Sequence, residues 1–221
     1  ELIRFDKQVD PATNMAAVEW KAYDQLGKGS LFTNILGHPG WQVCSQILAD
    51  RRKWAIALSL TEGELLDAMS RKLRSPIDPV VVDGAGAPVR EVVQVGDAAS
   101  LLDLPAMVTS EHDGGPYIAS GMAIYKDPET GIRNFSIHRQ QVMGAHKTGF
   151  VMLPRQARRI YDKYCAKGEA MPVAIAIGAH PAILFASGYT TEFGIDELSL
   201  AGGLLGDPVR LIKCETVDLE A

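Results

Sequence analysis

"IRNFSIHRQQVMG", residues 132–144, is the stretch on which the expected fold rests. Apolar and polar residues alternate along its first half, which is typical of a strand with one buried face. The residues expected on the polar side are Asn134, Ser136 and His138. Arg139 breaks the alternation, because it falls on the apolar side unless a bulge turns it. Such a group of donors could bind a phosphate or a carboxylate, and a solvated strand face with a surface ion pair is the plain alternative.

A β-hairpin is expected around this stretch. A second strand-like run, "YIASGMAIYKD", precedes it, and "DPETG" (127–131) lies between the two with proline and glycine at favoured turn positions. Pro154 and Gly168 then bracket a predicted helix. The remaining elements expected in this half are a strand-type apolar run at 171–187, a short helix at 194–206 and a last strand at 208–219.

The first hundred residues mix helices and short strands. The helix "TEGELLDAMSRKLR" (61–74) begins with Thr61 and Glu64 at the spacing of a capping box. The other elements expected here are a helix at 10–29, a strand at 30–36, and a strand pair formed by 79–84 and 89–96. The character of the sequence changes after "LLDLPAM", so we place a domain boundary near Leu104–Pro105, giving domains 1–104 and 105–221.

Composition excludes several classes of protein. The 221 residues are 47% hydrophobic and carry a net charge of −5, which suits a globular chain with a sizeable core and disfavours nucleic acid as a partner. No apolar run is long enough to cross a bilayer, and no leader opens the chain. Both ends look cut, since the chain starts without Met and stops directly after a strand-like run.

Three cysteines, Cys44, Cys165 and Cys214, lie far apart and show no CxxC spacing. This pattern favours buried free thiols in a reducing cytosol over a zinc site or a disulfide framework. P-loop, GxGxxG and GxSxG motifs are absent, and the five histidines show no metal-ligand spacing. Glu215 stands in an apolar run, where it is either exposed by alternation or a ligand for a metal or an arginine.

Several separated blocks, in the right order, resemble the UbiD family of reversible decarboxylases. The resemblance covers nearly the whole chain. Its main blocks are "DGGPYIASGMAIYKDPETGIRNFSIHRQQVMG" (113–144), "PVAIAIGAHPAILFAS" (172–187) and "GGLLGDPVRLIKCETVDL" (202–219), with weaker matches in "LFTNILGHPGW" (31–41) and "LDLPAM" (102–107).

The resemblance implies a fold and a reaction. It implies an α/β (α+β) architecture, with a small mixed α/β N-terminal domain before a split β-barrel flavin-binding domain. It also implies reversible non-oxidative decarboxylation of an aromatic or α,β-unsaturated carboxylic acid. The cofactors would be prenylated FMN, Mn²⁺ or Mg²⁺, and K⁺ as a further ion. The protein would be a cytoplasmic homo-oligomer without a membrane span, and a flavin prenyltransferase would supply its cofactor.

The resemblance also assigns roles to residues of this sequence. Asn134 matches an amide metal ligand and Glu215 a carboxylate ligand, and hard oxygen donors suit such ions. Arg139 matches the arginine that contacts both the flavin and the substrate carboxylate, which makes it the catalytic candidate. The residues that match cofactor-lining positions are Ser136, Ile137, His138, Val151, Met152, Leu153, Gln156, Ala157 and Ser187.

Two departures from the family pattern stand out. Some members carry a histidine metal ligand where this chain has Gln156. The family's two catalytic acids and its C-terminal domain would lie beyond Ala221, so this chain alone is expected to hold part of a cofactor site without turning over. Two rival readings stay open, namely an ordinary FMN oxidoreductase on a split barrel and a flavin-free structural paralogue.

Overall fold

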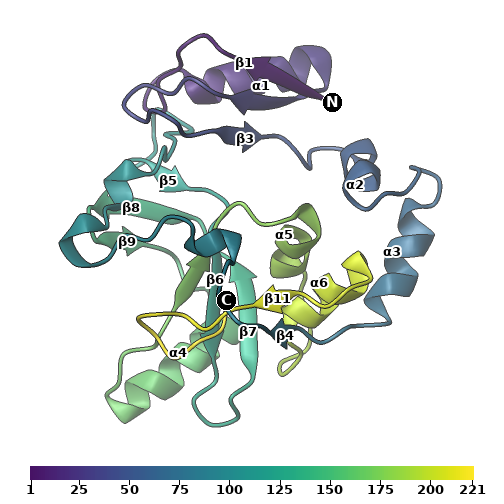
Figure 1. The fold of residues 1–221 in the computed structure, drawn as a ribbon, viewed down its shortest axis with the longest axis vertical. Helices are drawn as coiled ribbons and strands as arrows, with labels where there is room; N and C mark the ends of the chain where they lie inside the picture. The colour runs from purple at the N-terminus through teal and green to yellow at the C-terminus, as the bar shows by residue number, and fades with distance from the viewer. The chain divides into compact units, whose positions relative to one another are not determined.

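The computed structural model describes all of residues 1–221 as a mixture of helices and short strands, and the chain divides into two compact units (Figure 1). Unit 1 contains Glu1–Trp54, Gln94–Ala119 and Arg139–Phe150. Unit 2 contains Ala55–Val93, Ser120–His138 and Val151–Ala221. The chain therefore enters each unit three times, and the domain boundary near residue 104 stays a prediction.

Unit 1 holds two three-stranded sheets with the orders β1-β2-β3 and β5-β8-β9. β1 and β2 are parallel, and helix α1 connects them before it ends at Gly27 in the left-handed conformation. The elements of this unit are β1 Leu2–Phe5, α1 Met15–Leu26, β2 Gly29–Phe32, β3 Val43–Ser45, β5 Tyr117–Ile118, β8 Gln140–Gly144 and β9 Lys147–Gly149, with 3₁₀ turns at Gly96–Ala98 and Leu101–Asp103. α2, Arg51–Ala57, leads from unit 1 into unit 2.

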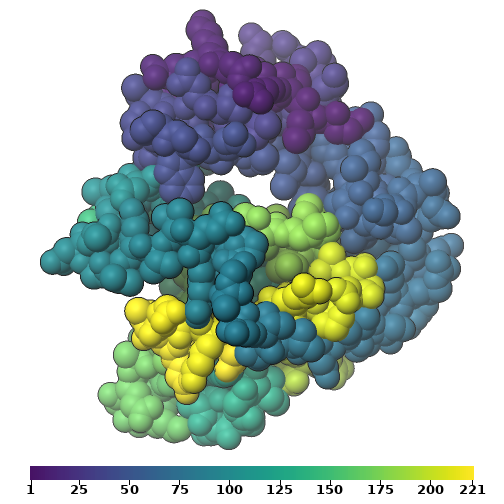
Figure 2. Space-filling model, viewed as in Figure 1, coloured from purple at the N-terminus to yellow at the C-terminus, as the bar shows by residue number.

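Unit 2 is built on an antiparallel sheet of order β10-β6-β7, beside a two-stranded parallel pair of β11 with β4. Its elements are α3 Leu65–Leu73, β4 Val80–Val81, β6 Met122–Lys126, β7 Arg133–Ile137, α4 Gln156–Lys167, β10 Ala174–Ala176, α5 Pro181–Gly188, α6 Glu197–Leu205 and β11 Arg210–Leu211, with a 3₁₀ turn at Pro88–Arg90. In the space-filling view the last residues of the chain, in yellow, lie on the visible surface of this unit (Figure 2).

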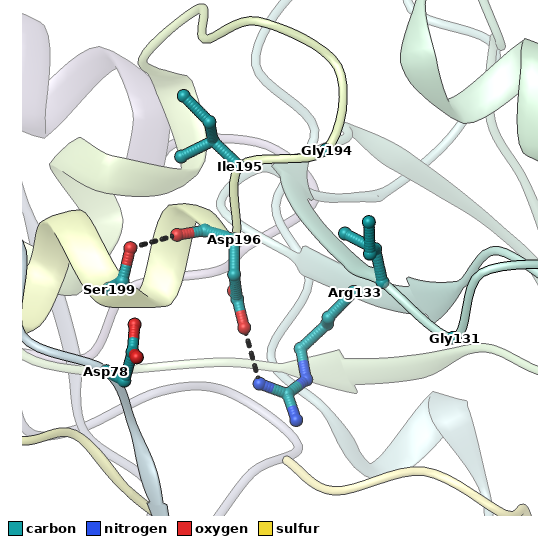
Figure 3. Close-up of a pocket in the computed structure, with 8 residues that line it drawn as sticks. Asp78, Gly131, Arg133, Gly194, Ile195, Asp196 and Ser199 are labelled. Atoms are coloured by element: carbon teal, nitrogen blue, oxygen red, sulfur yellow. Dashed lines mark hydrogen bonds and ion pairs between the residues drawn. The ribbon is translucent and has the colours of Figure 1, made fainter.

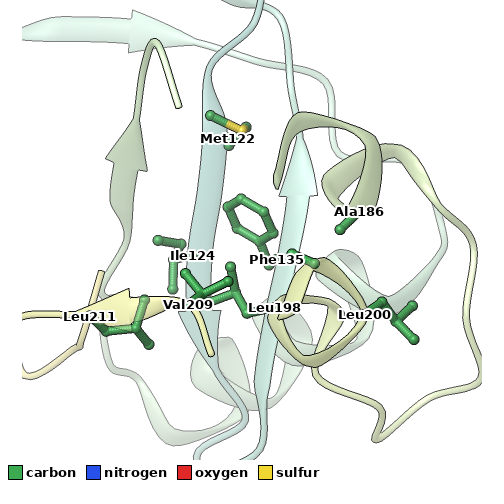
Figure 4. Close-up of a cluster of buried hydrophobic side chains, with 9 residues drawn as sticks. Met122, Ile124, Phe135, Ala186, Leu198, Leu200, Val209 and Leu211 are labelled. Carbon is green, nitrogen blue, oxygen red and sulfur yellow. The ribbon is translucent and has the colours of Figure 1, made fainter. Parts of the chain in front are cut away.

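Alternation along β6 and β7 separates two faces. Phe135 lies at the centre of the first face, where Met122, Ile124 and residues of α5 and α6 form the main apolar core (Figure 4). The second face carries Ala123 and Tyr125, which pack against α4. Because neighbouring residues of a strand point to opposite sides, Asn134 and Ser136 belong to this second face.

The stretch 132–144 is two strands and not one. β7 ends at Ile137 and stays in the sheet of unit 2, whereas β8 begins at Gln140 and pairs with β5 and β9 in unit 1. His138 and Arg139 make the passage between the two sheets. Arg139 therefore escapes the alternation of β7 by lying outside it.

Several expected elements are confirmed and others are wrong. The predicted helices at 10–29, 61–74, 154–168 and 194–206 correspond to α1, α3, α4 and α6, and the hairpin is formed by β6 and β7. The strand pair of 79–84 with 89–96 is wrong, because Val80–Val81 pairs with Arg210–Leu211. The apolar run at 171–187 is only partly a strand, since α5 begins at Pro181. The last strand is shorter than expected and ends at Leu211.

The thiols and the helix lengths bear on two further expectations. All three cysteines are free, as predicted, but Cys44 and Cys165 are exposed and Cys214 is half-buried, so the expectation of buried thiols is wrong. The longest helices have 12 residues, and none combines the length and apolar character needed to cross a membrane.

Candidate functional site

A cluster of buried amide and carboxylate groups lies at the edge strand β7 of unit 2. The Asn134 Nδ2 donates to Gln156 Oε1 and to Glu197 Oε1, at 2.8 Å in each case. The Phe135 backbone N–H donates to Glu197 Oε2 at 2.8 Å. Only 5% of Asn134 and 3% of Glu197 are exposed, so these groups interact out of contact with bulk water.

Local structure explains why these three side chains meet. β7 is the outer strand of its sheet, which leaves the Phe135 N–H free to bind a side chain instead of another strand. Glu197 is the first residue of α6, where a negative charge is favoured by the helix dipole, and the preceding Asp196 caps that helix. Gln156 is the first residue of α4, and its amide NH₂ donates to the Thr191 carbonyl.

The electrostatics of this cluster favour a cation. Burial raises the pKa of Glu197 to about 7, against the opposing effect of the hydrogen bond from the Phe135 N–H. Asn134 Oδ1 is buried and has no hydrogen-bond partner. An orphaned amide oxygen next to a carboxylate without a cationic partner is the arrangement that a bound cation would complete.

The donor set fits a hard divalent ion. Mg²⁺ and Mn²⁺ prefer carboxylate and carbonyl oxygens, which Glu197, Asn134 and Gln156 can all provide. No group of three or more His, Cys, Asp or Glu side chains is arranged to hold a metal anywhere in the structure. One carboxylate and two neutral amides would leave one of the two positive charges of such an ion for an anionic ligand.

Two hydroxyls and an imidazole form a second polar group on the same face of the sheet as Asn134. The Tyr125 hydroxyl and Ser136 Oγ share a short hydrogen bond. His138 Nε2 lies 3.0 Å from Ser136 Oγ and 3.3 Å from the Tyr125 hydroxyl. Burial lowers the pKa of His138, although a hydrogen bond to the Val151 backbone opposes the shift, so the neutral imidazole is favoured.

The predicted site residues of unit 2 are only partly brought together. Asn134 meets Gln156, and Ser136 meets His138, as described above. Ser187 is buried in α5, where its hydroxyl donates to the Leu184 carbonyl. The other positions expected to line a cofactor are Ile137, Val151 and Leu153, which are exposed, Met152, which is half-buried, and Ala157, which is buried against the second face of the sheet.

The structure does not bring Glu215 to Asn134. Glu215 lies after the end of β11, its side chain is 65% exposed, and its carboxylate pairs with Arg90 at 2.9 Å. The carboxylate beside Asn134 belongs to Glu197, which sequence reasoning did not single out. A glutamate at the start of a predicted helix is ordinary, so "GIDELSLAGG" gave no signal of a ligand. The role of Glu215 as a metal ligand stays a prediction.

Arg139 lies in unit 1 at the start of the connection into β8, and it is exposed. Its guanidinium forms no ion pair within the chain, unlike Arg133, whose side chain is held between two carboxylates. An exposed and uncompensated guanidinium is free to bind an anionic ligand. Its predicted role in binding a substrate carboxylate is compatible with this placement.

A pocket of about 430 Å³ lies on the other side of β7 (Figure 3). Arg133 donates from one terminal nitrogen to Asp196 Oδ2 at 2.6 Å (Figure 3). Its other terminal nitrogen donates to Glu220 Oε2 at 3.2 Å. Lys126 reaches the same Glu220 carboxylate at 2.5 Å. The charges of Arg133, Lys126, Asp196 and Glu220 compensate one another, so the network supports the start of α6. Burial and the nearby Asp78 carboxylate, which also lines the pocket, raise the pKa of Asp196.

Comparison with known proteins decides the family. Residues 80–221 match the 3-octaprenyl-4-hydroxybenzoate carboxy-lyase Rift-related domain, and residues 1–73 match the N-terminal domain of the same carboxy-lyase. The chain belongs to the UbiD family. The family predicted from the sequence is therefore confirmed, as is the mixed α/β class.

Several curated relatives of this UbiD-family chain are decarboxylases by name. Ferulic acid decarboxylase 1 of Saccharomyces cerevisiae is 31% identical over 238 residues, which cover 99% of this chain and 47% of that protein. Gallate decarboxylase of Lactiplantibacillus plantarum is 27% identical, over 98% of this chain and 47% of that protein. The chain spans about half the length of the curated relatives it matches.

Solved structures agree on the fold. The UbiD-class enzyme HmfF from Pelotomaculum thermopropionicum, in an evolved dimeric form in complex with prFMN, superposes with a TM-score of 0.93 at 37% identity, over 100% of this chain and 51% of that one. The 3,4-dihydroxybenzoic acid decarboxylase AroY of Klebsiella pneumoniae, an apo structure, gives a TM-score of 0.90 at 28% identity, over 100% of this chain and 49% of that one.

Proposed function

We propose that the protein carrying this chain catalyses the reversible, non-oxidative decarboxylation of an aromatic or α,β-unsaturated carboxylic acid, using prenylated FMN and a divalent cation. The single observation that carries the proposal is the buried cluster in which Asn134 Oδ1 has no partner beside the Glu197 carboxylate. Membership of the UbiD family supports the choice of reaction.

The cluster supplies the means to hold an anionic cofactor. Asn134, Glu197 and Gln156 would bind Mn²⁺ or Mg²⁺ through oxygen, and the bound ion would balance the charge of the flavin phosphate. Glu197 would lose its proton to solvent as the ion arrives, because an adjacent divalent charge favours the carboxylate. We keep Glu215 as the rival carboxylate ligand, to be tested against Glu197, and K⁺ as a further ion.

Arg139 would orient the substrate. Its guanidinium can donate two parallel hydrogen bonds to a carboxylate, which would fix the bond to be broken and hold the departing CO₂ group in place. When bound, the prenylated flavin supplies the electron sink that accepts the electron pair left on the substrate. We assign the lining of this cofactor to the exposed Ile137, Val151 and Leu153 together with His138.

The proposal extends to the surroundings of the reaction. A flavin prenyltransferase would supply the cofactor, and the protein would act as a homo-oligomer. Free and exposed thiols at Cys44 and Cys165 support a reducing compartment such as the cytoplasm. The two-domain division at residues 104 and 105 is kept as part of the same proposal.

Mass spectrometry of the small molecules released from the intact protein tests this function. The protein is produced in a host that makes prenylated flavin, and the metal content of the same sample is measured. We expect prenylated FMN together with manganese or magnesium, and Arg139→Ala should keep both while losing decarboxylation. Plain FMN without a metal would favour an oxidoreductase instead, and a protein without any flavin would point to a structural paralogue.

A further inference from the structure

A completely buried tyrosine hydroxyl stands out on the second face of the β6–β7 sheet. Tyr125 is 0% exposed, and its ring packs among apolar residues that include Ala157 and Ile160 of α4. A phenylalanine would fill this space equally well, so the hydroxyl is not explained by packing. Its hydrogen-bond partners are Ser136 Oγ and, at 3.3 Å, His138 Nε2.

The contacts of the imidazole define one protonation state. The imidazole donates a hydrogen bond to the Val151 backbone, the contact that raises its pKa against the effect of burial. The hydroxyls of Ser136 and Tyr125 both approach Nε2, at 3.0 Å and 3.3 Å. A neutral ring with its proton on Nδ1 satisfies every group, because Nδ1–H then donates to the backbone while Nε2 accepts from a hydroxyl.

A chain of donors follows from this assignment. Tyr125 donates to Ser136, Ser136 donates to His138, and His138 donates to the backbone at Val151. The Ser136 hydroxyl both accepts from Tyr125 and donates to His138, so these two hydrogen bonds polarise each other. This series of hydrogen bonds joins β6 and β7 to the segment that precedes α4.

That segment has few other attachments. The side chains of Val151 and Leu153 are 76% and 58% exposed, so they do not bury against the sheet. Met152 packs partly against the apolar cluster under α4. The backbone contact with His138 is therefore a principal attachment of residues 151–153 to β7.

We propose that Tyr125 is a positioning residue which, through Ser136, fixes the orientation and tautomer of His138 and so holds residues 151–153 in the place where they contact the flavin. The contact with flavin rests on the proposed function, but the attachment of the segment does not. In this role Tyr125 touches neither the cofactor nor the substrate, and it acts only through the imidazole.

Tautomer assignment by NMR tests the first half of the proposal on the flavin-free protein. Long-range ¹H–¹⁵N correlation of the five histidines identifies which ring nitrogen of His138 carries the proton. We expect Nδ1–H in the wild type and a mixture of tautomers in Tyr125→Phe, with no change in Tyr161→Phe, which removes an exposed hydroxyl of α4. A proton on Nε2 in the wild type would overturn the assignment.

A double-mutant cycle on FMN affinity tests the second half. One neutral hydrogen bond corresponds to a change of about 2- to 10-fold, so Tyr125→Phe should weaken FMN binding within that range. His138→Ala should weaken it by at least as much, and adding Tyr125→Phe to His138→Ala should have no further effect.

The outcomes separate the inference from the function on which it rests. If Tyr125→Phe weakens FMN binding as much in the His138→Ala background as in the wild type, then Tyr125 has a general packing role, and the inference is overturned. A wild-type protein that binds neither FMN nor prenylated FMN would refute the proposed function, and the tautomer measurement would still decide whether Tyr125 positions His138.

Discussion

Glu19 is a buried carboxyl group with no cationic partner. It lies on α1 in unit 1, is 3% exposed, and leaves Oε2 without a hydrogen-bond partner. Burial raises the pKa of Glu19, and hydrogen bonds from Ser45 and Gln46 only partly oppose this shift. The folded protein therefore holds a proton at a pH where the unfolded chain has released it, and stability falls as the pH rises from the unfolded pKa toward the folded one.

Glu19→Gln should remove this loss of stability. At pH 3, well below the ordinary pKa of a glutamate, the carboxyl is protonated in the folded and unfolded states alike, so the variant and the wild type should differ little there. At pH 8 the variant should gain, by an amount on the order of 1 kcal/mol, because it no longer has to bury a charge. Thermal unfolding at both pH values measures the difference, with the exposed Glu62→Gln as the control. A difference in melting temperature that does not change with pH would contradict the account.

Asn134 and Glu197 show how far residue-level prediction reaches. Alternation in "RNFSI" correctly placed Asn134 and Ser136 on one face. This was predictable because successive side chains of a strand point to opposite faces whatever the strand's partners are. The partner of Asn134 lies 63 residues away at a helix start, and only the fold brings it to the amide. Tyr125 was missed for a similar reason, since its hydroxyl gains meaning only from its cross-strand neighbours.

Helix α6 depends on two glycines for its close contact with the segment after α3. A Cβ at Gly202 would collide with the Ile77 carbonyl oxygen, and a Cβ at Gly203 would lie 2.7 Å from the Lys72 carbonyl oxygen. The Ile77 N–H donates to the Ser199 carbonyl at 2.9 Å, which fixes this backbone beside the helix. The sequence "AGGLL" is therefore a contact surface, although glycine lowers helix propensity.

Gly202→Ala should destabilise the protein although alanine is the better helix former. Propensity alone would favour alanine by about 1 kcal/mol, whereas forcing the backbone apart should cost about 2–3 kcal/mol more than that gain. Gly188→Ala is the matched control, since a Cβ at the end of α5 meets no atom within 4 Å. Urea unfolding compares the two, and equal stabilities for both variants would refute the close contact.

Elements with local signals were predictable, and those with distant partners were not. α1 and α4 each end at a glycine in the left-handed conformation, a signal contained within the helix and its cap. Val80–Val81 looked like half of a local hairpin, yet its partner β11 lies some 130 residues later in the chain. The apolar run before Ser187 was ambiguous by itself, because a buried helix and a buried strand read alike over short lengths.

At the scale of the whole molecule, the passage at His138 and Arg139 links the two compact units. Asn134, the candidate ligand for a cation, lies in unit 2, as does the series of hydrogen bonds from Tyr125. Arg139 begins the next segment of unit 1. The polar residues gathered in 132–144 thus serve two different environments. The sequence predicted their chemistry well, but it suggested one continuous strand where the chain changes sheets.

The central claim is that Asn134 and Glu197 hold the cation that retains the flavin. The most direct measurement compares the metal and flavin content of the intact protein with those of Glu197→Gln and Glu215→Gln, all purified from a host that makes prenylated flavin. We expect about one divalent ion per chain in the wild type, loss of most metal and flavin in Glu197→Gln, and retention of both in Glu215→Gln. Full metal and flavin content in Glu197→Gln, with loss of both in Glu215→Gln, would contradict the claim.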